Sequence, residues 1–235
     1  MMEQLSGNPL LLSHPFAQPA AIRSCGPLLL VVHGRAGGLI PEEIRAFSAA
    51  LAARRRSPVA IEALTAECRP PFIEPELTLV PLLLLPGVHV CRDVPAIRQR
   101  LRGEGLRVRS VPFLGSWRGW LQYLSRWVQS EREKGRSPLL VHHPLSMAAG
   151  CRYLSMLEER LCLPLLRADG VAPYCADERS ITSLLPLALA PNRMTEALAE
   201  RFAAEGKGTF RLEAPCLLGH APTRSFLLDL LQRLP

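Results

Sequence analysis

Aromatic side chains and lysine are both scarce in this sequence of 235 residues. Phenylalanine, tryptophan and tyrosine together make up 6% of the chain, whereas proteins that bind nucleic acid combine basic side chains with aromatic stacking surfaces. The sequence therefore argues against nucleic acid as a partner. Only Lys134 and Lys207 are lysines, so the net charge of +7 is carried by arginine. Arginine suits carboxylate or phosphate partners, although a general preference for arginine over lysine would give the same count.

Several motifs that would define a cofactor or a nucleophile are missing. The seven cysteines form no CxxC pair, which disfavours a zinc ribbon or a compact iron–sulfur centre. No GxGxxG follows the first predicted strand, and no phosphate-binding loop of the Walker type occurs, so a dinucleotide cofactor is not supported. No GxSxG elbow indicates a serine hydrolase. We expect no cofactor of these kinds.

Long apolar runs and a basic leader are missing as well. The run 82–85 is far too short to span a bilayer, and residues 1–26 lack the charged start of a secretory signal. We therefore expect a cytoplasmic protein that does not enter the membrane, with reduced thiols and a flexible N-terminal tail over residues 1–26.

The sequence does contain a β-α-β-α alternation, which predicts an α/β fold with a mostly parallel sheet flanked by helices. With 48% hydrophobic residues the chain can bury a sizeable core. Apolar runs typical of buried strands alternate with segments of helical character. The predicted strands are 27–34, 59–65, 77–85 and 107–113, and the predicted helices are 41–55, 95–102 and 117–134, with a turn or short helix at 70–76.

The pattern is repeated later in the chain. LLVVHGR at 29–35 is echoed by LLVHHPL at 139–145, which aligns His33 with His143. VPLLLLPGVH at 80–89 is echoed by LPLALAPNRM at 185–194, which aligns His89 with Met194. VPFLG at 111–115 is echoed by APCLLG at 214–219, with Pro112 on Pro215. We infer two fused α/β halves, 27–134 and 137–235.

Two histidines follow predicted parallel strands directly. His33 and His89 each come just after the carboxyl end of a strand, the edge at which open α/β sheets bind ligands. Two imidazoles at this edge could bind a divalent metal ion. Taken singly, each is better explained as a histidine that hydrogen-bonds to backbone at a strand end; occurring together, they favour a site.

Other polar side chains are expected near this edge. Glu67 follows the second strand, where it could accept a proton or complete the coordination of a metal ion, although a solvated loop glutamate is the simpler explanation. Arg92 is the arginine nearest His89 and could bind a substrate carboxylate. Arg98 and Arg102 share a helix face that ordinary solvation would explain equally well.

Three segments of the sequence resemble the sirohydrochlorin chelatases, which are class II tetrapyrrole metal chelatases. The resemblance lies in LLLVVHGR, LTAECRPP and LVPLLLLPGVHVCRDVP, and it covers about residues 27–115. Proline, glycine, histidine, Asp93 and Pro95 of the third segment fall at the family's spacing. Arg35 stands where serine is common in the family.

The resemblance implies an enzyme that inserts iron(II) or cobalt(II) into sirohydrochlorin without ATP, in siroheme or cobalamin biosynthesis. By the same resemblance, His33 and His89 are the metal-binding histidines and Glu67 is the glutamate that acts with them. The substrate carries eight carboxylates, for which Arg35 and Arg92 are candidate partners. The metal would be a substrate, and no further cofactor is implied. The resemblance further implies that the two halves face each other across a cleft, so that a duplicated chain of this kind is expected to be a monomer with an internal pseudo-two-fold axis.

The second half departs from the family pattern. It has Met194 where the alignment expects a second histidine, and no acid is securely equivalent to Glu67. We therefore expect one active site, built from the first half, with the second half as its opposing wall. A non-catalytic tetrapyrrole- or metal-binding protein of the same fold, or insertion into another tetrapyrrole, remains an alternative.

Overall fold

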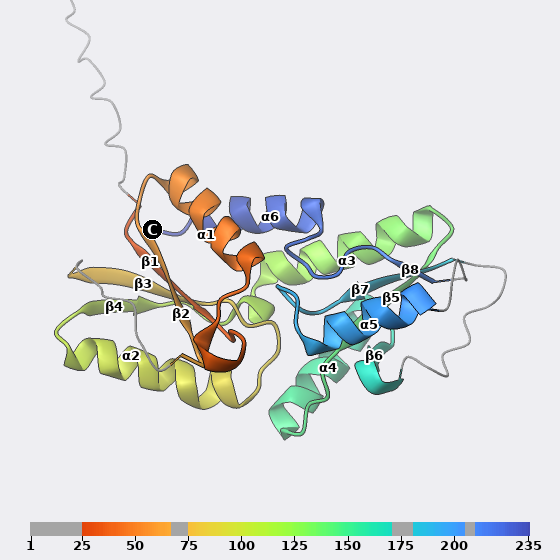
Figure 1. Cartoon of the computed structure of the whole chain (residues 1–235), viewed down its shortest axis with the longest axis horizontal. Coiled ribbons are helices and arrows are strands. Elements are labelled where there is room, and N and C mark those ends of the chain that lie inside the picture. Colours follow the sequence, from red (N-terminus) through yellow and green to blue (C-terminus); the bar gives the residue numbers. More distant parts are fainter. Residues whose placement is uncertain (1–24, 67–74, 171–180, 205–209) are drawn as a thin grey trace, which may run out of the picture.

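Two four-stranded parallel sheets form the framework of the computed structural model, which describes residues 25–66, 75–170, 181–204 and 210–235 (Figure 1). The first sheet has the order β2-β1-β3-β4 and the second the order β6-β5-β7-β8. This arrangement confirms the predicted α/β class. The strands are β1 (Leu28–Val32), β2 (Val59–Ala63), β3 (Glu76–Pro81), β4 (Arg107–Ser110), β5 (Ser137–His142), β6 (Leu165–Arg167), β7 (Thr182–Pro186) and β8 (Phe210–Leu212).

The central strand β1 is covered on both faces. All five of its side chains are buried, because it lies between β2 and β3 and helices cover the sheet on both sides. Leu28, Leu30 and Val32 belong to one core cluster, and Leu29 and Val31 to another. This explains why the strand is a continuous apolar run without alternation. It also fixes the direction in which His33, the next residue, leaves the sheet.

The helices follow the strands in sequence. Pro41 directly precedes the first turn of α1, where Glu42 and Glu43 suit the positive end of the helix dipole. None of the helices in the described part of the chain is long and apolar enough to cross a membrane. The helices are α1 (Glu42–Arg55), α2 (Val94–Gly103), α3 (Arg118–Glu133), α4 (Ala148–Leu161), α5 (Arg193–Ala204) and α6 (Ala221–Leu231).

Each half packs its last helix against the other half. The helix α3 contacts β5 and α4, whereas α6 lies beside α1 (Figure 1). Arg54 on α1 pairs with Asp229 on α6 at 2.6 Å, and Tyr123 on α3 stacks on Phe226 of α6. One core cluster therefore contains residues of both sheets. The two halves share a core, so they do not form two separately packed units.

Buried Arg55 ties the end of the chain to the first half. Its guanidinium donates hydrogen bonds to the carbonyl oxygens of Leu231, Leu234 and Gly26, at distances between 2.6 and 3.1 Å. A buried cation needs such partners, since an unpaired one would be costly. The C-terminal residues after α6 are thus held against α1.

The strand register of the two sheets agrees with the first two repeated segments of the sequence. Val31 pairs with Pro81 in the first sheet, and Val141 pairs with Pro186 in the second. His143 therefore occupies the place in the second half that His33, two residues after Val31, occupies in the first. The sequence alignment of the first two repeated segments is correct at these strands.

The third repeated segment is aligned differently in the structure. The N–H of Gly115 donates to the carbonyl of Leu83, and the N–H of Leu217 donates to that of Ala188. Since Leu83 and Ala188 are equivalent by the register, Gly115 corresponds to Leu217. The predicted match of the two prolines is one residue out, because the connection from Ala188 to Leu217 is three residues shorter than that from Leu83 to Gly115, whereas the sequence alignment allowed for two.

All four strands of the first sheet end earlier than predicted, and β3 differs most. The strand β3 ends at Pro81, although the prediction extended to residue 85, and β4 ends at Ser110. Leu82 and Leu84 are nevertheless buried in the core. Buried residues are apolar whether or not they belong to a strand. The apolar run therefore could not show where the hydrogen bonding between β3 and its neighbours ends.

Candidate functional site

His33 lies at the carboxyl edge of the first sheet, as predicted. It follows β1 directly, and Gly34 then turns the chain with a φ of 76°. A Cβ atom on Gly34 would lie 2.6 Å from the Thr65 hydroxyl oxygen and 2.8 Å from the Ala63 Cβ. The Thr65 hydroxyl lies 3.2 Å from the His33 carbonyl oxygen. The segment that carries His33 is thus held against the end of β2 by a turn that only glycine fits.

His89 lies on a helical turn rather than at the end of a strand. Residues His89–Asp93 form a π-helical turn that leads into α2, and the Val94 N–H donates to the His89 carbonyl. The expected strand end at His89 is therefore wrong. The turn brings the Asp93 carboxylate to 2.6 Å from His89 Nδ1, and both side chains are about two-fifths exposed. Single π turns of this kind occur frequently at functional sites.

The two histidine rings meet at this edge. Their centroids are 4.8 Å apart and their planes are inclined by 81°. His33 Nδ1 lies 2.8 Å from the Gly34 carbonyl oxygen, and His89 Nδ1 faces the Asp93 carboxylate. Both partners accept hydrogen bonds, so Nδ1 of each neutral ring carries the proton and Nε2 holds the lone pair. A second interaction of this kind is usual for histidines that bind metals.

A complete metal site is not present among the described residues. No three His, Cys, Asp or Glu side chains of that part of the chain come together so as to hold a metal ion. The predicted third participant, Glu67, lies outside the described residues. The two imidazoles could provide two nitrogen donors to a metal ion, whose remaining positions other ligands would have to fill.

Arg35 reaches across to the second half. Its guanidinium Nη2 donates to the Pro191 carbonyl oxygen at 3.1 Å and forms an ion pair with Glu196 on α5. The sequence placed Arg35 near His33, which is where its backbone lies. Its partners in the second half were not predicted, because they are more than 150 residues away along the chain.

Arg92 lies beside His89, as predicted from the sequence. Arg92 is exposed on the π-helical turn and has no ion-pair partner among the described residues, so it is available to an anionic ligand.

The second half contributes a histidine to the same region. Burial, and secondly the neighbouring His33 and His142, lower the pKa of His143, which the strand register places just after β5 at the carboxyl edge of the second sheet. His142 is buried, and its Nδ1 lies 2.6 Å from the His143 carbonyl oxygen. Gly150, at the start of α4, would bring a Cβ to 3.1 Å from the Pro86 carbonyl oxygen. The carboxyl edges of the two sheets therefore face each other.

Met194 does not stand in the place of His89. It is 5% exposed and packs in the outer core cluster of the second sheet with Leu184 and Leu198. The helix α5 begins here with a capping arrangement, in which the Thr195 N–H donates to the Asn192 side-chain oxygen at 3.0 Å. The second half thus starts its helix without the π-helical turn, and Met194 points into its own core.

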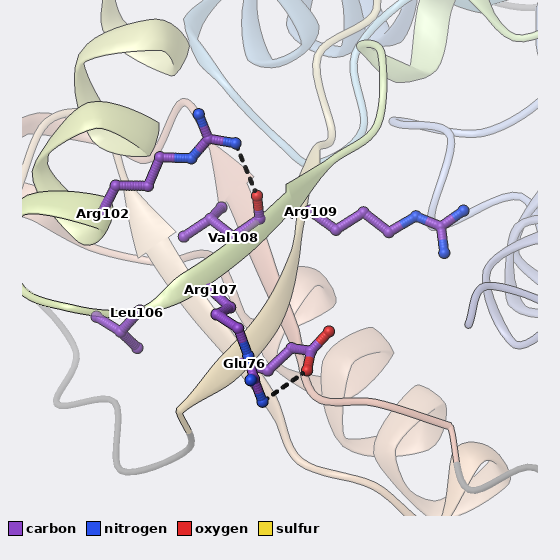
Figure 2. A pocket seen from close by; sticks show the side chains of 6 residues that line it. All are labelled: Glu76, Arg102, Leu106, Arg107, Val108 and Arg109. Carbon is purple, nitrogen blue, oxygen red and sulfur yellow. Dashed lines mark hydrogen bonds and ion pairs between the residues drawn. The ribbon is translucent and has the colours of Figure 1, made fainter.

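A separate hollow of about 470 Å³ lies at the opposite end of the first sheet (Figure 2). It is formed where β3 and β4 begin, whereas the histidines lie beyond the strand ends. Arg107 pairs with Glu76 at 3.2 Å, and Arg102 donates to the Val108 carbonyl. Figure 2 shows the Arg109 side chain pointing away from both. Two of the three arginines are already engaged in contacts within the protein, so this hollow is a weaker candidate for a binding site than the edge that carries the histidines.

Two residues of the site were not assigned a role from the sequence. Asp93 was noted only for its spacing, although a histidine and an aspartate four residues apart can meet on a helical turn. No sequence pattern indicated a role for Glu196, because its contact with Arg35 depends on the packing of α5 against the first half. The first could have been found from the sequence, and the second could not.

Solved structures with the same fold are known. No protein-family model matches the sequence. A search of curated proteins gives no match either. The sirohydrochlorin chelatase SirB from Bacillus subtilis subspecies spizizenii, solved in complex with cobalt, is 18% identical, with a TM-score of 0.56 over 87% of this chain and 93% of that chain.

Two further structures agree with it. SirB from Bacillus subtilis with Fe3+ is 17% identical, with a TM-score of 0.57 over 88% of this chain and 94% of that one. CbiX, described as the terminal enzyme for biosynthesis of siroheme in denitrifying bacteria, is 17% identical, with a TM-score of 0.59 over 90% of this chain and all of the other. This chain therefore has the two-sheet fold of the sirohydrochlorin chelatases.

Proposed function

We propose that this protein is a chelatase that inserts a divalent metal ion, iron(II) or cobalt(II), into sirohydrochlorin without ATP. The observation that carries the proposal is the His33–His89 pair, in which both Nε2 lone pairs are free of hydrogen bonds to described residues. Neutral imidazoles are good ligands for these metals. The product would serve siroheme or cobalamin biosynthesis.

The reaction exchanges one metal ion for two pyrrole N–H protons. His33 and His89 would hold the metal substrate through Nε2 and leave other positions open to the macrocycle nitrogens. The Asp93 carboxylate and the Gly34 carbonyl oxygen keep the Nδ1 protons in place, so that neither ring loses its metal-binding tautomer. Glu67 is proposed to accept protons from the substrate.

Arginines are proposed to bind the substrate carboxylates. Arg92, exposed on the turn that carries His89, can pair with a carboxylate without breaking an existing ion pair to a described residue. Arg35 can do so only by exchanging a partner, since it contacts Glu196. The net charge of +7 favours the approach of a polycarboxylate.

A second candidate is a non-catalytic tetrapyrrole- or metal-binding protein of the same fold. The observation that favours it is that, among the described residues, the π-helical turn with its histidine occurs only in the first half, while Met194 is buried in the core of the second. One half has thus lost, or never had, a metal-binding pair. Such a protein would bind a tetrapyrrole without accelerating its metallation.

The test is a chelation assay with sirohydrochlorin and Fe2+, Co2+ or Ni2+ in parallel, followed by the change in visible absorption. Metallation faster than the spontaneous reaction supports the proposal. Tight binding of the metallated product at the spontaneous rate would support the binding protein instead. A dicarboxylate porphyrin in the same assay tests the choice of tetrapyrrole.

We also propose that the chain acts as a monomer, because both facing edges belong to one chain and share a core. Sedimentation at assay concentration tests this. The cytoplasmic location expected from the sequence stays a prediction.

A further inference from the structure

The ion pair between Arg35 and Glu196 joins the two halves beside the histidine pair. Arg35 lies two residues after His33 at the carboxyl edge of the first sheet, and Glu196 lies on the first turn of α5 in the second half. The Arg35 side chain is 39% exposed and that of Glu196 is 46% exposed. A half-exposed ion pair of this kind is weak and exchanges its partners readily.

The backbone of Arg35 is fixed, although its side-chain partner can change. The Thr65 hydroxyl lies 2.6 Å from the Arg35 carbonyl oxygen, and the Arg35 N–H donates to the Leu39 carbonyl at 2.8 Å. Gly34 anchors the preceding turn against the end of β2. The guanidinium therefore always starts from the same point beside His33, and only its far end selects a partner.

We propose that Glu196 is a specificity-determining residue that occupies Arg35 in place of a substrate carboxylate. This inference rests on the proposed function, since it concerns the same site. A ligand with a carboxylate in the right position takes over Arg35 and releases Glu196. A ligand without one has to enter against an intact contact between the halves. The pair thus selects for an acidic tetrapyrrole by competition.

The proposal makes an unusual prediction for Glu196→Gln. If Glu196 served only to orient Arg35 for the substrate, its loss would weaken substrate binding. If it competes with the substrate, the variant binds more tightly, by about two- to five-fold, which is the range expected from the strength of a half-exposed pair. The sign of the change therefore separates the two roles.

Glu200→Gln is the matched control. Glu200 is exposed on the same helix, one turn further along, so both variants raise the net charge by one on α5. A gain in both variants would be a general effect of charge and would overturn the proposal. A gain in Glu196→Gln alone, lost again in high salt, supports it.

The experiment is a titration of the full-length protein with metal-free sirohydrochlorin, followed by the absorption and fluorescence of the tetrapyrrole. Arg35→Ala should weaken binding about ten-fold, as expected for loss of a charged hydrogen bond, and should abolish the effect of Glu196→Gln in the double variant. The same titrations with Arg35→Lys, alone and combined with Glu196→Gln, repeat the test with the positive charge at position 35 kept. Weaker or unchanged binding by Glu196→Gln overturns the proposal.

Failure of this inference and failure of the proposed function give different results. A protein that binds sirohydrochlorin with the predicted order of affinities but does not accelerate metallation is not a chelatase, while the role of Glu196 stands. A protein that metallates sirohydrochlorin but shows no gain in Glu196→Gln is a chelatase without this selection. A wild-type protein that does not bind sirohydrochlorin contradicts both.

Discussion

The imidazole rings of His33 and His89 meet edge to face with their centroids 4.8 Å apart, although they are distant in sequence. They follow two neighbouring strands of the first sheet, since β1 pairs directly with β3. Each ring keeps its Nδ1 proton on an acceptor and leaves Nε2 for a ligand. The expected effects of substitutions start from this relationship and from the framework that supports it.

Asp93→Asn should weaken metal binding without unfolding the protein. The neutral amide of an asparagine would be a poorer partner for His89 Nδ1 than the carboxylate, so the ring would lose basicity and a fixed tautomer. Loss of such an outer partner costs about 10- to 100-fold in metal affinity. Calorimetric titration with Co2+ measures the change. Asp229→Asn, which removes an acid paired with Arg54 away from the site, is the control, and equal affinities of the two variants would disprove the role of Asp93.

Gly115→Ala should destabilise the fold strongly. A Cβ atom at this position would lie 1.8 Å from the carbonyl oxygen of Leu84, which is backbone and cannot move aside locally. We expect a loss of about 2 kcal/mol or more in the free energy of unfolding, measured by urea denaturation.

The control for that variant is Gly103→Ala. Gly103 is the last residue of α2, and a Cβ built there has no described atom within 4 Å apart from its chain neighbours and its own helix backbone. Alanine should be neutral there or stabilise by up to about 1 kcal/mol. Similar losses in both variants would show that the close approach at Gly115 is not what requires glycine.

Glu131 should make the stability depend on pH in the acid range. Burial alone would raise the pKa of this carboxyl, but hydrogen bonds from Lys134, Ser183 and Arg136 outweigh it and lower the pKa to about 2. The folded state therefore holds the ionised form more strongly than the unfolded state, whose pKa is near 4.5. The contribution is complete above pH 4.5 and is lost as the pH falls towards 2.

The measurement compares the free energy of unfolding of the wild type and Glu131→Gln at about pH 3 and about pH 7. The wild type should be more stable by on the order of 3 kcal/mol at neutral pH, and the difference should shrink in acid. A difference that is the same at both pH values would contradict the assignment.

Sequence patterns predicted the parts of this fold that depend on burial and on strand order. The run at 27–34 indicated β1 and placed His33 at its end, because a strand buried on both faces has no polar residue until it leaves the core. The run at 77–85 was misjudged for the same reason: Leu82 and Leu84 are buried without being in a strand. His89 was therefore predicted at a strand end, whereas it begins a π-helical turn.

The contacts between the two halves could not be predicted from the sequence. Nothing near Arg35 indicates Pro191 or Glu196 as its partners, since the docking of α5 decides them. Nor could the alignment of His89 with Met194 reveal that the methionine packs in its own core. An alignment of one residue with another shows neither where its side chain points nor the backbone turn that determines this direction.

Metal insertion through the His33–His89 pair is tested most directly by the initial rate of Co2+ insertion into sirohydrochlorin by the wild type, His33→Ala and His89→Ala. Both side chains are substantially exposed, so their removal should leave the fold intact. The control is His220→Gln, since His220 contacts Thr223 at the start of α6. We expect a loss of at least about 100-fold in each alanine variant and a normal rate in the control. Wild-type rates in both alanine variants would contradict it.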